Sequence, residues 1–262
     1  MFKIEYEDVN GQKAIPWQNS WGITTRTIGV MIMVHSDDKG LVLPPRVAPL
    51  QVVIIPVTFK GTDTAKQLEM CAEIASQLAD AGVRVKVDDR TNYNPGWKYN
   101  HWELKGVPLR LELGPKDMAK RQIRLVRRDT NEKEDVPLAV LTQKVALSLV
   151  TMQHDLLSRA RATRDARLAR VMAWEDFVPA ISEGKLVLTP FCDETEFEEL
   201  VKTKSKEEAL AALGEEEDDR CATPVAAKTL CIPFEQPELP EGTKCFISGK
   251  PAVCWVLWGR SY

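Results

Sequence analysis

The spacing of apolar positions in residues 47–155 predicts a small sheet covered by helices. Short apolar or alternating runs are typical of strands, and apolar residues three and four apart are typical of amphipathic helices. Gly82 follows one such helix, at the position that glycine prefers after a helix end. The predicted strands are residues 51–57, 83–87, 107–114 and 121–128, and the predicted helices are residues 63–81 and 94–106. Strands and helices in this order indicate a mixed α/β fold.

Different patterns flank this region on both sides. Before it, a predicted strand (Trp17 to Thr24) runs into an apolar helix, and Pro44 and Pro45 mark a boundary because proline lacks a backbone donor. After it, residues 137–173 read as one long helix. The remainder predicts a compact α+β module with strands at 185–192 and 227–234, a helix near 194–204 and a terminal hairpin. We therefore expect three domains: 1–46, 47–155 and 156–262.

Composition narrows the choice of function only a little. The net charge is -3 and the isoelectric point is about 5.8, which excludes a uniformly basic nucleic-acid coat and leaves room for a local patch. No run of 18 apolar residues occurs, and the N-terminus carries charges where a signal peptide needs an apolar core. We expect a cytoplasmic protein without a membrane segment.

Residues 20–46 suggest part of a nucleotide site, because a glycine-punctuated strand leads into Arg26 and an apolar helix. A guanidinium at such a junction can stack on adenine and also bind a phosphate, and Thr24 and Thr25 add small polar groups. On the residues alone, it is an equally good interpretation that Arg26 simply caps a surface strand. Either a short chain builds a pocket from very little, or the chain is the later half of something larger.

Glu103, Arg110 and Lys133 form a second constellation. Glu103 and Arg110 lie seven positions apart across a helix-to-strand junction, and Lys133 lies in a predicted loop after the following strand. A carboxylate can accept from the N1–H and N2–H of guanine while a cation donates to its O6, so this trio suits unpaired guanines. On the residues alone, a surface ion pair is the more frequent meaning of Glu103 and Arg110.

Two further features are each compatible with two interpretations. Trp97 and Trp102 can stack on bases, but their spacing within a short helix is more often core packing. A row of arginines either contacts an RNA backbone or pairs with Asp165 and Glu175 on a solvated helix face. The row comprises Arg159, Arg161, Arg164, Arg167 and Arg170.

A resemblance covers nearly the whole chain. The stretch WQNSWGITTRTIGVMIMVHSDDKGLVLPPRVAPLQVVIIP resembles the third class-defining motif of prolyl-tRNA synthetases of the eukaryotic and archaeal type, running into their anticodon-binding domain. The likeness continues through NYNPGWKYNHWELKGVPLRLELGPKDMAKRQIRLVRRDT and AKTLCIPF to the terminal GRSY. The resemblance implies a three-layer anticodon-binding domain with a five-stranded mixed sheet, a C-terminal α+β module and a fragment of the class II antiparallel catalytic sheet.

The resemblance also implies an activity, the ATP-dependent attachment of proline to its tRNA, with Mg²⁺ accompanying ATP. The first two motifs of the class have no counterpart here, so we expect the chain alone to be catalytically incomplete. The implied partners are proline tRNA, proline and ATP, with a homodimer in the full-length enzyme. The alternative is a non-catalytic module that binds tRNA or protein.

Site residues carried over from the family fall into three groups. The ATP group is Arg26, Thr24 and Thr25; the proline-pocket group is Ser20, Trp21 and Gly22; the anticodon group is Glu103, Arg110 and Lys133. The resemblance also implies that the terminal Tyr262 returns toward the active site, whereas an ordinary buried C-terminus is the alternative.

In its metal ligands the chain departs from the resemblance. Many family members carry four zinc-binding cysteines in the last module, of which Cys192 and Cys245 remain, while Phe197, Ile247 and Ser248 stand where the others belong. Two cysteines cannot close a tetrahedral site, so we expect no zinc. A rearranged site would have to recruit Cys221, Cys231 or Cys254.

Overall fold

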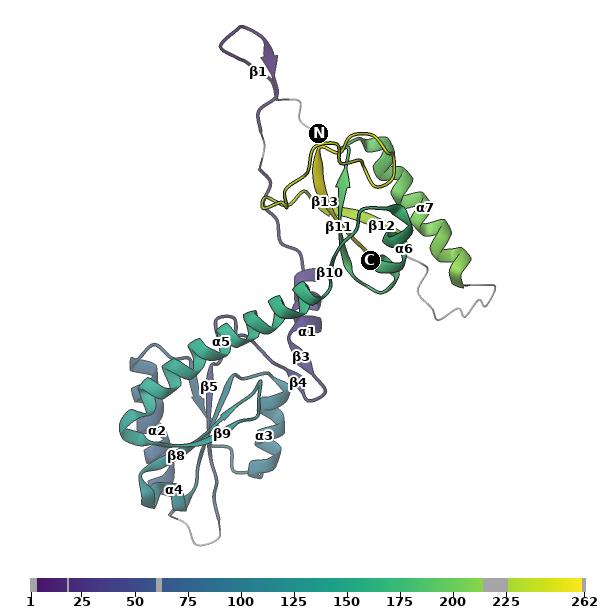
Figure 1. Ribbon diagram of the computed structural model, residues 1–262. Coiled ribbons are helices and arrows are strands. Elements are labelled where there is room, and N and C mark those ends of the chain that lie inside the picture. The colour runs from purple at the N-terminus through teal and green to yellow at the C-terminus, as the bar shows by residue number, and fades with distance from the viewer. Residues whose placement is uncertain (1–3, 18, 60–62, 214–225, 261–262) are drawn as a thin grey trace. The chain divides into compact units, whose positions relative to one another are not determined.

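The computed structural model describes residues 4–17, 19–59, 63–213 and 226–260 (Figure 1). It divides into two compact units, Met1–Leu156 and Leu157–Tyr262, and each is described by itself. None of the helices in the described ranges is long and apolar enough to cross a membrane. The acidic segment after residue 213 lies outside the described residues.

The first unit is built on a five-stranded mixed sheet, as predicted. Its strand order is β6-β5-β7-β8-β9, with β5, β6 and β7 parallel and β8 and β9 antiparallel to their neighbours. The strands are β5 (Val52–Pro56), β6 (Val85–Val87), β7 (Leu109–Leu113), β8 (Gln122–Arg127) and β9 (Lys133–Pro137). The loop predicted at Lys133 is wrong, because Lys133 begins the edge strand β9.

One face of this sheet is buried by two helices, α2 (Thr64–Asp80) and the first part of α5 (Leu141–Ala166). Alternate strand residues such as Ile54, Leu111 and Leu125 project toward them, and Cys71, Leu78 and Val145 fill the space between. Asp63 caps α2 by accepting from the amide of Lys66 at 3.2 Å. The burial of this face accounts for the clear alternation along β7 and β8.

The opposite face is covered only in part, by the short helix α3 (Pro95–Leu104). Asn94 caps α3 by accepting from the amide of Trp97 at 2.8 Å, and Pro95 occupies the first turn, where a missing N–H does no harm. Trp102 and Val107 pack on Val53 and Ile55 of the central strand β5. Figure 1 shows α3 on the other side of the sheet from α2. The outer strands β8 and β9 on this face therefore carry charged side chains such as Arg124 and Asp135.

A buried carboxylate, Asp88, fastens α3 to the end of β6. The Asp88 side chain is 0% exposed and accepts from Nε and Nη2 of Arg90 at 2.8 and 2.7 Å and from Nε1 of Trp102 at 2.7 Å. Lys98 donates to the Asp88 carbonyl at 2.9 Å. Burial alone would raise the pKa of Asp88, but the hydrogen bonds from Arg90 and Trp102 and the charge of Lys98 bring this pKa below its usual range. The carboxylate therefore stays ionised.

The residues before β5 contain short elements only: β1 (Tyr6–Glu7), β2 (Lys13–Ala14), α1 (Arg26–Val34), β3 (Ser36–Asp37) and β4 (Gly40–Leu41). The β3-β4 ribbon is tied to the sheet by the buried Arg128, which donates to both carboxylate oxygens of Asp37 at 2.7 and 2.5 Å. The strand predicted from Trp17 to Thr24 is wrong, because residues 19–24 pair with no described strand. Before β5, the described residues form two separate two-stranded ribbons, β1-β2 and β3-β4.

The second unit contains a four-stranded mixed sheet of order β10-β11-β13-β12. Its strands are β10 (Leu168–Arg170), β11 (Leu186–Phe191), β12 (Ala227–Cys231) and β13 (Cys254–Arg260), and the helices α6 (Trp174–Ser182) and α7 (Thr195–Leu213) complete the predicted α+β module. The core joins Phe177, Phe246 and Trp258, whose ring centroids lie 4.9 to 5.8 Å apart.

One predicted helix end is wrong, and the predicted terminal hairpin is only partly present. The long helix ends at Ala166 instead of about residue 173, because residues 168–170 pair in parallel with β11. The predicted terminal hairpin is confirmed only as a short turn, in which Lys244 and Pro251 form an antiparallel bridge. The strand that follows, β13, lies between β11 and β12 and pairs with both.

A stability test follows from the close approach of β4 to the end of α3. Gly106 has a φ of +71°, and an added Cβ would lie 2.6 Å from Cβ of Leu41. Gly82 after α2 has a similar φ of +81° but nothing within 4 Å of such a Cβ. We expect Gly82→Ala to lower the free energy of unfolding by about 1–2 kcal/mol, the cost of the left-handed conformation. Gly106→Ala should cost about 1–3 kcal/mol more through overpacking.

Urea unfolding of the two variants, followed by circular dichroism, measures this difference directly. The matched φ values make Gly82→Ala the control for backbone strain. Equal losses in the two variants would contradict the tight contact between Gly106 and Leu41.

Candidate functional site

The partly covered face of the first sheet carries a transverse row of residues that includes Arg110 and Lys133. Register pairs Val53 with Arg110, Arg110 with Val126, and Val126 with Lys133. Directly paired residues project from the same face, and strands lie about 4.8 Å apart. Arg110 and Lys133 therefore share this face at about 10 Å from each other, which is two strand spacings.

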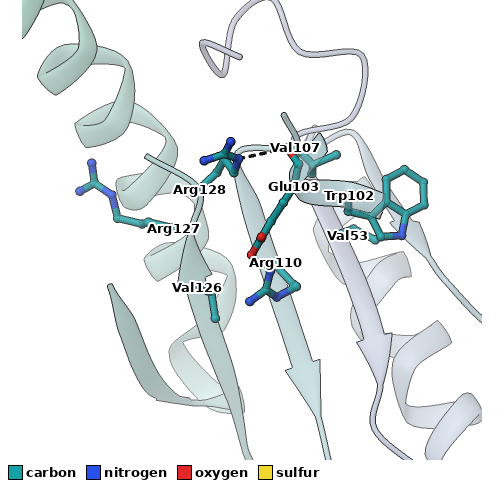
Figure 2. A pocket seen from close by; sticks show the side chains of 8 residues that line it. All are labelled: Val53, Trp102, Glu103, Val107, Arg110, Val126, Arg127 and Arg128. Carbon is teal, nitrogen blue, oxygen red and sulfur yellow. Dashed lines mark hydrogen bonds and ion pairs between the residues drawn. The ribbon is translucent and has the colours of Figure 1, made fainter. Parts of the chain in front are cut away.

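Glu103 and Arg110 are in direct contact. Glu103 lies in the last turn of α3, and its Oε1 accepts from Nη1 of Arg110 at 2.7 Å. The Nε of Arg110 donates to Oε1 of Glu112 at 2.9 Å, and the Arg110 side chain is only 11% exposed. Figure 2 shows the Glu103 carboxylate pointing to Arg110. The ion pair expected from the residues alone is present, but it is largely withdrawn from solvent.

A small cavity adjoins this pair, beneath the loop that joins α3 to β7. It measures about 10 Å³, room for roughly one water molecule, and is lined by Val53, Trp102, Glu103, Val107, Arg110, Val126, Arg127 and Arg128 (Figure 2). Arg128 closes one side by donating from Nε to the carbonyl of Glu103 at 3.1 Å. A cavity of this size cannot admit a nucleobase.

An open cleft of about 810 Å³ lies on the other side of the pair. Its lining includes Phe59, Tyr99, Glu112, Lys116 and Arg124. Tyr99 and Glu112 connect the cleft to the Glu103–Arg110 pair, since the Arg110 guanidinium lies 4.3 Å from the Tyr99 ring centroid. The cleft is large enough for a small ligand or a flipped base. The exposed ring of Phe59, the half-buried ring of Tyr99 and charges of both signs are groups of the kind that bind unpaired bases.

Tyr99 stays a neutral phenol throughout the physiological pH range. Burial, followed by the charge of Glu112, raises the pKa of Tyr99 to about 12. The ring therefore offers an uncharged stacking face and a hydroxyl group. Sequence reasoning missed Tyr99, although it lies four residues before Glu103 on the same helical face.

Glu112 and Arg124 were also missed. Alternation along β7 places Glu112 on the face of Arg110, and register places Arg124 opposite Glu112. Arg124 also donates to Asp135 of β9 at 2.8 Å. The alternating pattern in the sequence contained the signal that these residues share one face.

The residues expected around ATP and proline are exposed, and none of them lies in a strand. Arg26 begins α1, a helix without buried residues, and Thr25 precedes it without a side-chain capping bond. Trp21 is 95% exposed. Ser20, Gly22 and Thr24 are exposed as well, and none of the six lines either cavity described above.

The two remaining cysteines lie together in the second unit. Cys192 and Cys245 are buried, and the Ser248 hydroxyl lies 3.5 Å from Sγ of Cys192. Phe197 packs against the same core. Burial raises the pKa of Cys192, whereas hydrogen bonds from Ser248 and the Ile247 amide outweigh burial and lower that of Cys245. Within the described residues, no three His, Cys, Asp or Glu side chains converge as a metal-binding group.

The structure distinguishes in part between the two interpretations of the tryptophans and of the arginine row. Trp102 is a core residue, because it is 5% exposed and bonded to Asp88. Trp97 remains 39% exposed. In the arginine row, Arg164 pairs with Asp165 at 2.6 Å, and Arg170 lies over the ring of Trp255 at 5.1 Å.

Comparison with known proteins gives two family matches. The family described as "Anticodon binding domain" matches residues 51–146, and the family described as "Prolyl-tRNA synthetase, C-terminal" matches residues 174–262. These two ranges contain the five-stranded sheet and most of the second unit.

Several curated proteins that match the whole chain carry proline–tRNA ligase in their names. A cytoplasmic proline–tRNA ligase of Arabidopsis thaliana is 50% identical over all 262 residues, which are 47% of that protein. A bifunctional glutamate/proline–tRNA ligase of Drosophila melanogaster is 45% identical, and a proline–tRNA ligase of Encephalitozoon cuniculi is 41% identical. Both matches cover the whole chain, with 15% and 52% of the relatives' own lengths.

The chain thus spans about half, or less, of the length of the curated relatives that it matches. Within that span the likeness is continuous from the segment of Arg26 to the C-terminal sheet. The chain belongs to the prolyl-tRNA synthetase family.

Proposed function

We propose that this chain reads the anticodon of proline tRNA as part of a proline–tRNA ligase. The observation that carries the proposal is the pairing of Glu103 with Arg110 beside an open cleft, on a sheet face that α3 leaves half uncovered. The family matches and the names of the relatives support tRNA as the partner.

The geometry suits the two adjacent guanines that proline anticodons carry, which we call the guanine pair. Their Watson–Crick edges present N1–H and N2–H donors next to an O6 acceptor. Glu103 and Glu112 supply carboxylate acceptors, Arg110 supplies a planar donor between them, and Lys133 lies farther along the same face. Tyr99 offers a ring on which a base can stack. On binding, hydrogen bonds to the base edge replace the ion pairs of Arg110 with Glu103 and Glu112. These side chains are already largely withdrawn from solvent.

We further propose that the complete enzyme binds ATP with Mg²⁺ beside Arg26, Thr24 and Thr25, and proline beside Ser20, Trp21 and Gly22. The support is the family membership together with the position of Arg26 at the start of α1. A cytoplasmic location and a homodimer of the complete enzyme belong to the same proposal, the former supported by the name of the Arabidopsis relative.

Base reading predicts a selective loss of affinity. Glu103→Ala and Arg110→Ala should each weaken binding of proline tRNA by about 1–3 kcal/mol, because each removes hydrogen bonds to a base edge. Binding of the same tRNA with both guanines replaced by uridine should change little. Filter binding or fluorescence anisotropy at fixed salt gives both affinities.

Arg164→Ala serves as the control, since Arg164 is an exposed arginine paired with Asp165 on α5. Any loss through a phosphate contact at Arg164 should be equal for the two tRNAs. Losses of equal size on both tRNAs for Glu103→Ala and Arg110→Ala would refute base reading. Circular dichroism confirms that each variant is folded.

A catalytic test addresses the proposed ATP and proline groups. We expect the 262-residue chain to show no proline-dependent exchange of pyrophosphate into ATP, because Arg26 and its neighbours are exposed and line neither cavity described here. In-line transfer needs carboxylate and α-phosphate held in place. Robust exchange that depends on proline and is lost in Arg26→Ala would overturn the proposal that the chain is catalytically incomplete.

We propose that the C-terminal unit folds without zinc. Its donor set beside Ser248 is the thiols of Cys192 and Cys245, and a phenyl ring, Phe197, packs against the same core. Elemental analysis of the purified chain should find clearly less than one equivalent of zinc, and a chelator should leave the melting temperature unchanged. One equivalent of zinc per chain, or melting lowered by the chelator, would contradict this.

A further inference from the structure

Three aromatic rings form a ladder at the start of α3. Tyr93 stacks on Trp97 with ring centroids 3.7 Å apart and an interplanar angle of 10°, and Trp97 stacks on His101 at 4.8 Å and 17°. We call Tyr93, Trp97 and His101 the aromatic ladder. Trp97 lies in the middle with a ring on each face, so Tyr93 is the outer rung.

The aromatic ladder is built rigidly but is not buried. Tyr93 is 36% exposed and Trp97 is 39% exposed, whereas Trp102 on the same helix is 5% exposed. A ladder that served only core packing would bury its rings as Trp102 does. Three parallel rings held against solvent therefore call for another explanation.

An anchored arginine holds the ladder in place. The guanidinium carbon of Arg90 lies 5.1 Å from the ring centroids of both Tyr93 and Trp97. The same guanidinium is fixed by two hydrogen bonds to the buried carboxylate of Asp88. Such an arrangement orders the rings before any ligand arrives, which lowers the entropic cost of binding.

The surroundings of the ladder are basic. Lys86 and Lys105 are exposed. Their Nζ atoms lie 5.9 and 5.1 Å from the ring centroid of Trp102, a residue of the same helix α3 that carries Trp97 and His101. Burial lowers the pKa of His101, and the charges of Lys105, Arg90 and Lys86 lower it further, with only Asp88 opposing. Exposed rings among cations are the combination that binds single-stranded nucleic acid.

We propose that the aromatic ladder is a stacking platform for an unpaired base of the tRNA loop, outside the guanine pair. The base stacks on the outer face of Tyr93 and continues the ladder, while Arg90 beside Tyr93 faces the adjoining phosphate. The ligand is thus single-stranded RNA, held by its π-face and backbone. This inference rests on the proposed function and adds to it a contact that reads no sequence.

The ladder and the anticodon site lie on two flanks of one helix. Tyr99 and Glu103 face β7, whereas Trp97 and His101 lie about 200° away around α3, given 100° per residue. A helix with its side chains is about 10 Å wide. A loop that crosses α3 can therefore place splayed bases on both flanks at once.

The test uses the whole chain and proline tRNA. Tyr93→Leu keeps an apolar side chain on the face of Trp97 but removes the aromatic rung, and Tyr93→Phe keeps the rung. We expect Tyr93→Leu to weaken binding about 5- to 150-fold and Tyr93→Phe to leave it unchanged. The loss should be the same for the tRNA whose guanine pair is replaced by uridines, because stacking tolerates any base.

A spectroscopic readout separates stacking from a structural effect. Proline tRNA carrying 2-aminopurine in the loop beside the guanine pair should be quenched by the wild-type chain and by Tyr93→Phe, but not by Tyr93→Leu. Thermal melting checks that the fold of each variant is intact.

The outcomes distinguish the two proposals. Wild-type affinity in Tyr93→Leu, or a loss confined to the tRNA with guanines, overturns the platform, whatever Glu103 and Arg110 do. If Tyr93→Leu weakens both tRNAs and removes quenching while Arg110→Ala affects both tRNAs equally, the platform stands and guanine reading fails.

Discussion

The carboxylate of Asp88 is the contact on which the arrangement of the first unit depends. An ion buried at 0% exposure costs several kcal/mol unless it is paired and fully hydrogen-bonded, and Asp88 meets that cost through Arg90, Trp102 and Lys98. Two of these partners, Lys98 and Trp102, belong to α3. Ionisation of one side chain thus fixes the position of the helix that carries both candidate RNA surfaces.

The second constraint is the unequal covering of the sheet. Helices α2 and α5 pack on one face, while on the other face the apolar residues of α3 pack on the central strand β5. The uncovered part carries Arg110, Glu112 and Arg124 at the edge of an open cleft, and its ion pairs keep these charges ordered in the absence of a ligand. A stable core on one face and charge on the other let one small domain fold and present a polar surface to a ligand.

The sequence was most informative where burial is one-sided. The strands β7 and β8 were predicted because their apolar residues must face α2 and α5, whereas β5 was predicted from a continuous apolar run that is buried on both faces. The contact of Glu103 with Arg110 follows from the helix-to-strand junction. The strand β9 was missed because Lys133–Pro137 buries only Val136, which leaves no alternation to recognise. The end of α5 depends on the pairing of residues 168–170 with β11, a strand that is distant in the sequence. Residues 19–24 pair with no described strand. A local pattern contains neither piece of information. Trp97 gave an ambiguous signal because a stacked surface ring and a core ring share the same spacing.

A double-mutant cycle tests, at the level of single atoms, the proposed contact of Glu103 with the base edge of a guanine. Inosine lacks the N2 amino group of guanine, so wild-type chain and Glu103→Ala are each titrated with proline tRNA that carries either guanine or inosine in the pair. We expect a coupling energy of about 1 kcal/mol or more, because removing the amino group lowers the affinity only while the carboxylate is present. Losses that simply add, to within about 0.5 kcal/mol, would contradict it.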